Sequence, residues 1–98
     1  MDAFETIQVK VPQTELLALL AEEAVELAHA ALKLRRVYDG TNPTPVKRSE
    51  AFANIKEELA DVGLIVSVLG LDRHNPEIMR IQQDKLERWL RRLGEVEA

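Results

Sequence analysis

Residues 21–27 read Ala-Glu-Glu-Ala-Val-Glu-Leu and lie inside a pattern of apolar residues that recurs with the period of an α-helix. At about 100° per residue, Glu23 falls near the middle of the apolar stripe of this helix, and Glu26 falls at its edge. A carboxylate that faces a protein core is costly unless it is paired, hydrogen-bonded or bound to a metal ion. The stretch therefore predicts a helix over residues 14–38 with an acidic site on its buried side.

The same arrangement occurs again in a second predicted helix, residues 49–69, where Glu58 and Asp61 share the apolar face. If the two helices pack together, four carboxylates gather in one place, and no basic residue lies on those faces within a turn of them. One alternative is that both pairs are solvated surface acids. Two pairs on two apolar stripes favour a hard divalent cation, so Glu23, Glu26, Glu58 and Asp61 are predicted ligands of Mg²⁺, with Mn²⁺ as a second possibility.

The segments outside these helices carry helix-breaking signals. Residues 1–12 alternate weakly and end at Pro12, which predicts a leader arm that is either extended or disordered. Residues 39–47 contain Gly40 and two prolines, and therefore predict a loop in which Gly40 ends the first helix.

Capping residues set the expected helix starts. Thr14 and Ser49 are suitable N-caps for the first two helices, and Asn75 followed by proline marks the start of a third helix over residues 76–93. The sequence shows no repeats and no convincing paired strands. It therefore predicts an all-α fold, a small helical bundle that forms one domain over residues 1–98.

Size and composition narrow the function classes. The chain has 98 residues, a net charge of −4 and no cysteine, which argues against a nucleic-acid-coating surface and excludes disulfides and thiolate metal sites. There is no signal-peptide pattern, and the longest apolar stretch, residues 62–71, is too short to cross a bilayer. We expect a cytoplasmic protein without membrane contact. Residues 62–69 are apolar nearly all round, so we expect a homodimer or homotetramer that completes the small core.

Two acidic motifs in this order resemble a known family. Glu-Glu-x-x-Glu at residues 22–26, within Leu-Ala-Glu-Glu-Ala-Val-Glu-Leu-Ala, and Glu-x-x-Asp at residues 58–61, within Glu-Glu-Leu-Ala-Asp-Val, resemble the MazG-like all-α nucleoside triphosphate pyrophosphohydrolases. The resemblance covers about residues 14–93. It implies an oligomeric helical bundle that uses Mg²⁺ to hydrolyse nucleoside triphosphates to monophosphate and pyrophosphate, as in the house-cleaning of nucleotides.

The resemblance also implies roles for single residues. The four paired acids match the family's metal ligands, and Glu22 matches a supporting carboxylate that orients the attacking water. The block that runs from Gln83 to Trp89 resembles the family's downstream basic motif, in which Lys85 and Arg88 contact the substrate. Gln83 stands where the family usually has asparagine.

Each candidate for substrate binding also has a structural interpretation. Lys85 either points at an anion or rests its stem on apolar surface, and Arg88 is better explained as a surface residue. Lys33 faces a phosphate or simply solvent, and Asn54 binds base or sugar or merely orients Glu58. For Trp89 we expect core packing.

Two other function classes fit part of the pattern. Glu26 and His29 form one Glu-x-x-His motif, as in carboxylate-bridged di-iron bundles, but such sites need the motif on two helices. His29 also lies off the apolar stripe, so we expect it to be exposed. A non-catalytic adaptor that binds a partner or oligomerises through residues 62–71 is the remaining alternative.

Overall fold

The computed structural model describes residues 1–41 and 46–95, and within these ranges the chain is helical with no strand. The elements are α1 (Ala3–Lys10), α2 (Gln13–Asp39), α3 (Arg48–Val68) and α4 (Pro76–Arg92). The all-α prediction is confirmed. Residues 42–45 of the predicted loop, and the last three residues of the chain, lie outside the described ranges.

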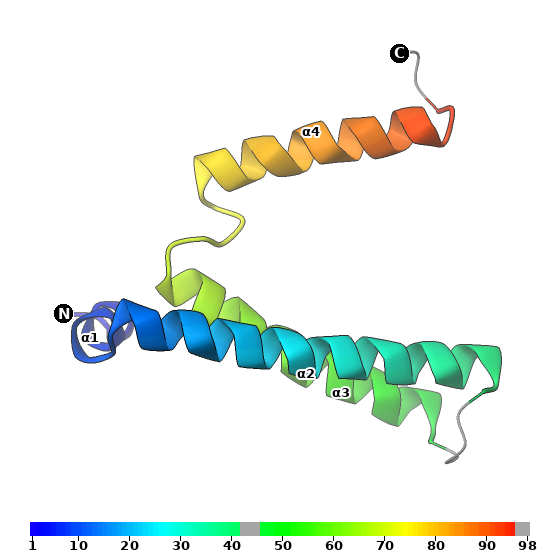
Figure 1. Ribbon diagram of the computed structural model, residues 1–98, viewed down its shortest axis with the longest axis horizontal. Helices are drawn as coiled ribbons and strands as arrows, with labels where there is room; N and C mark the ends of the chain where they lie inside the picture. Colours follow the sequence, from blue (N-terminus) through cyan, green and yellow to red (C-terminus); the bar gives the residue numbers. More distant parts are fainter. Residues whose placement is uncertain (42–45, 96–98) are drawn as a thin grey trace.

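The body of the fold is a hairpin of α2 and α3, which lie side by side over most of their length (Figure 1). Its buried residues are few and mostly small: Leu16 and Ala30 on α2, and Ala51 and Val68 on α3. Alanine at the contact lets two helix backbones approach closely, because it has only a methyl group to accommodate. The other apolar residues of the predicted stripe of α2 are half-buried.

Residues 3–10 are a helix, so the expectation of an extended or disordered leader was wrong. The Asp2 carboxylate caps this helix by accepting a hydrogen bond from the backbone N–H of Glu5 at 2.8 Å. The helix is also tied to the hairpin, because the Gln8 side-chain amide donates to the Val68 carbonyl at 2.7 Å. A cap at one end and a tertiary contact at the other outweigh the weak alternation seen in the sequence.

The helix ends agree with the sequence at some caps and differ at others. Helices α2 and α3 begin after Pro12 and Lys47 without a side-chain cap bond, so the predicted caps Thr14 and Ser49 were wrong and lie inside the first turns. The Asn75 cap of α4 is confirmed. Its side-chain oxygen accepts hydrogen bonds from the backbone N–H groups of Glu77 and Ile78, at 3.0 and 3.2 Å. Gly40 ends α2 at φ 75°, a left-handed conformation that favours glycine.

Helix α4 lies apart from the hairpin, connected to it by the segment after α3 (Figure 1). It contains no buried residue and makes no extensive contact with another helix among the described residues. Most of its large apolar side chains are exposed, and only Ile78 and Leu90 are half-buried. The exposed ones are Met79, Ile81, Leu86, Trp89 and, just after the helix, Leu93. The prediction that Trp89 packs into the core was therefore wrong, because this residue is 65% exposed.

Candidate metal centre

Carboxylates from both helices of the hairpin converge on one place. One carboxylate oxygen each of Glu23 on α2, and of Glu58 and Asp61 on α3, lies within 4.8 Å of the other two. The spacing of three residues puts Glu58 and Asp61 on one side of α3, and the antiparallel packing of α2 brings Glu23 beside them. The sequence predicted this meeting of acids from two helices.

The three carboxylates are close enough together to be candidate ligands of one oxygen-liganded cation. Two oxygens on opposite sides of Mg²⁺ are about 4.2 Å apart, and on opposite sides of Ca²⁺ about 5 Å apart. The three oxygens lie within 4.8 Å of one another, so they are near enough to share one ion of this size once their side chains close on it. Glu23 and Glu58 are half-buried while Asp61 is exposed, so the cluster is open to solvent on one side.

The clustered carboxylates repel one another, because their negative charges are not paired with cations in the described chain. Burial raises the pKa of the Glu58 carboxyl, and the neighbouring charges of Asp61, Glu23, Glu26 and Glu57 raise it further. No ion pair in the described part of the chain involves the clustered carboxylates. A divalent cation would remove this repulsion directly.

The other two predicted acids of α2 lie at the margin of the cluster. Glu26 is exposed and is not among the three converging groups, although its charge acts on Glu58. Glu22 is exposed and also lies outside the three. Both are within one helical turn of Glu23 along α2.

The predicted substrate-binding residues divide into two groups. Lys33 on α2 and Asn54 on α3 are half-buried, and Asn54 lies one turn before Glu58 on the same side of its helix. Lys85 and Arg88 are exposed on α4. With three neighbours they line a shallow hollow of about 430 Å³, the neighbours being Trp89, Arg92 and Leu93. Because α4 does not pack on the hairpin as α3 does, the described fold leaves these two cations apart from the acids.

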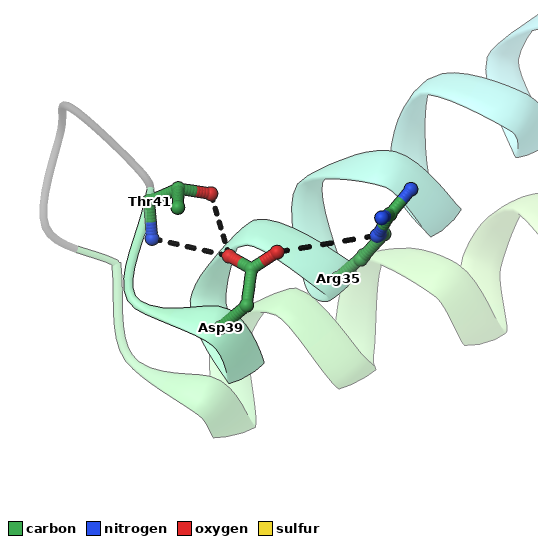
Figure 2. A network of polar contacts seen from close by, with 3 residues as sticks. All are labelled: Arg35, Asp39 and Thr41. Carbon is green, nitrogen blue, oxygen red and sulfur yellow. Dashed lines mark hydrogen bonds and ion pairs between the residues drawn. The ribbon is translucent and has the colours of Figure 1, made fainter.

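Sequence reasoning missed a polar network at the far end of the hairpin, shown in Figure 2. The Thr41 hydroxyl and backbone N–H both donate to Asp39, at 2.5 and 3.1 Å, and Arg35 lies 3.9 Å from the other carboxylate oxygen. These bonds from Thr41, and the positive charge of Arg35, lower the pKa of Asp39. The aspartate followed two residues later by threonine was the available signal.

Aromatic residues reinforce the same end of the hairpin. The Arg48 guanidinium lies 4.4 Å from the centre of the Tyr38 ring, and the Phe52 ring meets Tyr38 edge-on with centroids 6.0 Å apart. These contacts join the end of α2 to the start of α3. They hold the first turns of α3 against the last turn of α2.

The chain matches no protein-family model, no curated protein and no solved structure. Among the described residues, no helix has both the length and the apolar character needed to cross a membrane. His29, the residue on which a di-iron site would depend, is exposed and lies outside the carboxylate cluster.

Proposed function

We propose that this chain is a Mg²⁺-dependent nucleoside triphosphate pyrophosphohydrolase that converts a nucleoside or deoxynucleoside triphosphate and water to monophosphate and pyrophosphate, in the house-cleaning of cytoplasmic nucleotides. The observation that carries the proposal is the convergence of Glu23, Glu58 and Asp61 within 4.8 Å. The order and spacing of the two acidic motifs add to it through the resemblance to MazG-like enzymes.

The chemistry follows from the charge of the partners. A nucleoside triphosphate carries about four negative charges and is repelled by a cluster of carboxylates unless cations lie between them. Glu23, Glu58 and Asp61 hold the ion, with Glu26 as the nearest further ligand. Bound Mg²⁺ supplies polarisation of the phosphoryl oxygens and a more acidic water.

The remaining residues act on the substrate and the water. Glu22 orients the attacking water, whose oxygen adds to the α-phosphorus and whose proton passes to solvent. The bond from the α-phosphorus to the bridging oxygen breaks, and that oxygen leaves with the pyrophosphate. Lys85 and Arg88 neutralise the charge that develops on the leaving pyrophosphate. In this proposal Asn54 and Lys33 contact the nucleotide, since both lie half-buried on the hairpin.

Because Lys85 and Arg88 stand apart from the acids in one chain, the proposed enzyme acts as a homodimer or homotetramer. In such an assembly, α4 of a partner subunit brings the cations to the carboxylates. Mn²⁺ is expected to replace Mg²⁺, because both prefer oxygen ligands.

Release of pyrophosphate over a panel of nucleoside and deoxynucleoside triphosphates, with Mg²⁺ present, tests the proposal. Glu58→Gln is expected to lower kcat/KM by more than about 100-fold, because even the residues that support metal ligands contribute 10–100-fold. Glu50→Gln, an exposed glutamate two turns earlier on α3, is the matched control and should retain activity. Absence of turnover by the unmodified protein on every nucleotide would refute the function.

The non-catalytic alternative is a helical adaptor, and it is favoured by the exposed apolar side chains of α3 and α4. An adaptor holds no ion, so Glu58→Gln would leave its partner binding unchanged and its thermal stability equal or higher. Metal binding by the purified protein, measured by calorimetry with Mn²⁺, separates the two functions.

A further inference from the structure

A cavity that the proposed chemistry does not use lies at the end of the hairpin where α1 is attached. It opens where α1 packs against the end of α3, beside the start of α2, and its volume is about 210 Å³. The Gln8 side chain holds α1 in place there through its bond to the Val68 carbonyl. The residues that line the cavity are Gln8, Val11, Gln13, Leu16, Val68 and Leu69.

The lining of the cavity selects an uncharged ligand. Its lining residues are aliphatic side chains and two glutamines, and none of them carries a formal charge. A phosphate group would therefore find no cation there, and a cationic ligand would find no carboxylate. Primary amides both donate and accept hydrogen bonds, and aliphatic side chains pack on the faces of a flat ring. A nucleobase has this combination of apolar faces and a polar edge.

The size of the cavity agrees with a single ring system. Pockets that hold a whole drug-sized ligand measure about 300–1,000 Å³. At about 210 Å³ this cavity is too small for an entire nucleotide, but it suits the base with the sugar and phosphates outside. The bond to Val68 uses one of the two N–H groups of the Gln8 amide, so the other N–H and the oxygen can still pair with a ligand.

The cavity and the carboxylate cluster lie on one line along the hairpin. On α2, Leu16 precedes Glu23 by seven residues, which is about 10.5 Å along the helix and about 20° around it. On α3, Val68 follows Asp61 by the same number of residues, so the rise and the rotation are the same. Because α2 and α3 run antiparallel, both steps lead from the cluster toward α1 (Figure 1). The cavity is therefore about two helical turns from the clustered acids, on the same side of both helices.

We propose that this cavity binds the base of the nucleotide whose phosphates are held at the carboxylate cluster, with Gln8 and Gln13 pairing with the edge of the base. The identity of the ligand as a nucleotide rests on the proposed function. The ribose and the α-phosphate then span the two turns between the cavity and the acids. Lys33 lies beyond the cluster in the opposite direction along α2, so it is left to the terminal phosphates.

Nucleosides, which carry no phosphate, test the cavity without metal and without catalysis. The side-chain amide signals of Gln8 and Gln13, followed by nuclear magnetic resonance of the full chain, should shift saturably with at least one of adenosine, cytidine, uridine and thymidine. We expect a dissociation constant on the order of 1 mM, because a single nucleoside offers few atoms for contact. Gln82 and Gln83 on α4 do not line the cavity, so their signals are the internal control. Unmoved Gln8 and Gln13 signals with all four nucleosides would overturn the inference.

Substitution of Gln13 tests whether the base in the cavity is that of the substrate. Gln13→Leu removes the amide at an exposed position, so the packing of the helices is kept. It should raise KM for the preferred nucleoside triphosphate about 10-fold with little change in kcat, because a hydrogen bond to the base is lost. Gln13→Glu replaces the amide donor by an acceptor and should change the ratio of kcat/KM between two bases at least about 10-fold. Gln82→Leu is the matched control and should change neither quantity.

Failure of this inference and failure of the proposed function give different results. Shifted Gln8 and Gln13 signals in a protein that hydrolyses no nucleotide would refute the enzymatic function and leave a cavity that binds nucleosides. Hydrolysis with unmoved signals, or with KM unchanged in Gln13→Leu, would overturn the inference and leave the enzymatic function intact.

Discussion

Binding of a divalent cation should stabilise this protein against heat, and the effect should depend on Glu58. Its carboxylate lies with those of Glu23 and Asp61 inside 4.8 Å, well below the screening length of about 10 Å at 0.1 M salt, so buffer ions do not remove their repulsion. An ion that bridges them binds the folded chain and not the unfolded one, in which the two helices have separated. Stability therefore rises with the concentration of the ion.

The size of the effect follows from mass action. A weak site with a dissociation constant of about 1 mM, in 10 mM MnCl₂, gains about 1.4 kcal/mol, since the gain is RT times the logarithm of about 11. For a domain of about 100 residues this raises Tm by about 6–11 °C. Scanning fluorimetry or calorimetry at one fixed protein concentration measures the shift.

Substitutions separate ion binding at the cluster from general effects of salt. Glu58→Gln removes one ligand and part of the repulsion, so without metal its Tm should equal or exceed that of the unmodified protein, and its shift with Mn²⁺ should fall below about 2 °C. Glu50→Gln should keep the full shift. An equal shift in both variants, or none in the unmodified protein, would refute the reasoning.

The pH dependence has a defined sign. The pKa of Glu58 is raised in the folded chain, so its contribution to stability without metal is present below the ordinary value of 4.5 and is lost as pH rises through the folded pKa. Stabilisation by bound metal instead increases as pH rises, because at low pH protons compete with the metal for the same carboxylate oxygens. The rise in Tm with Mn²⁺ should therefore be larger at pH 7.5 than at pH 5.

Three further predictions concern the scaffold. Ala51→Leu should lower the free energy of unfolding by about 1–3 kcal/mol, because Ala51 is 2% exposed between α2 and α3. Ala53→Leu, at an exposed position of the same helix, is the control and should change the free energy of unfolding by less than about 0.5 kcal/mol. Urea denaturation measures both. Asn75→Ala removes the cap of α4 and should lower the stability of the first turns of this helix by about 1 kcal/mol. Amide hydrogen exchange in those turns should then be about fivefold faster. The lowered pKa of Asp39 makes its contribution to stability present above the ordinary value of 3.8 and lost as pH falls through the folded pKa, so Asp39→Asn should flatten the dependence of Tm on pH between about 5 and 3.

Each scaffold prediction has a result that would contradict it. Equal urea midpoints for the two alanine variants would mean that the α2–α3 contact has room that the structure does not show. Unchanged exchange in α4 would mean that another contact holds the start of this helix. If Tm depends on pH between about 5 and 3 as strongly in Asp39→Asn as in the unmodified protein, that dependence arises from other carboxyl groups.

Much of the helical organisation could be predicted from local sequence. Gly40 ended the first helix and Asn75 with the proline after it began the last, because a left-handed cap and a side-chain cap depend on one or two residues. Residues 3–10 were not predicted as a helix, because part of what holds them is the bond from Gln8 to Val68, sixty positions along the chain. Contacts at such a separation leave no local pattern.

The candidate site was also predicted only in part: its acids were placed from the sequence, and its basic residues were not. Helical periodicity placed Glu23, Glu58 and Asp61 on facing sides, and the structure brings them together. Periodicity could not place Lys85 and Arg88, because the position of α4 relative to the hairpin depends on the connection after α3 and on what packs against it. Trp89 shows the same limit, because it was expected to pack into the core and is 65% exposed in the described structure.

The sequence by itself determined that this protein is helical, where its main helices lie, and that acids occupy the facing sides of two of them, because these properties follow from spacing along one helix. Only the tertiary structure decided which acids meet, that the first residues form a helix tied to α3, and that the apolar side of α4 is left open. Those outcomes depend on how separate helices pack, and packing is set by contacts between residues far apart in the chain.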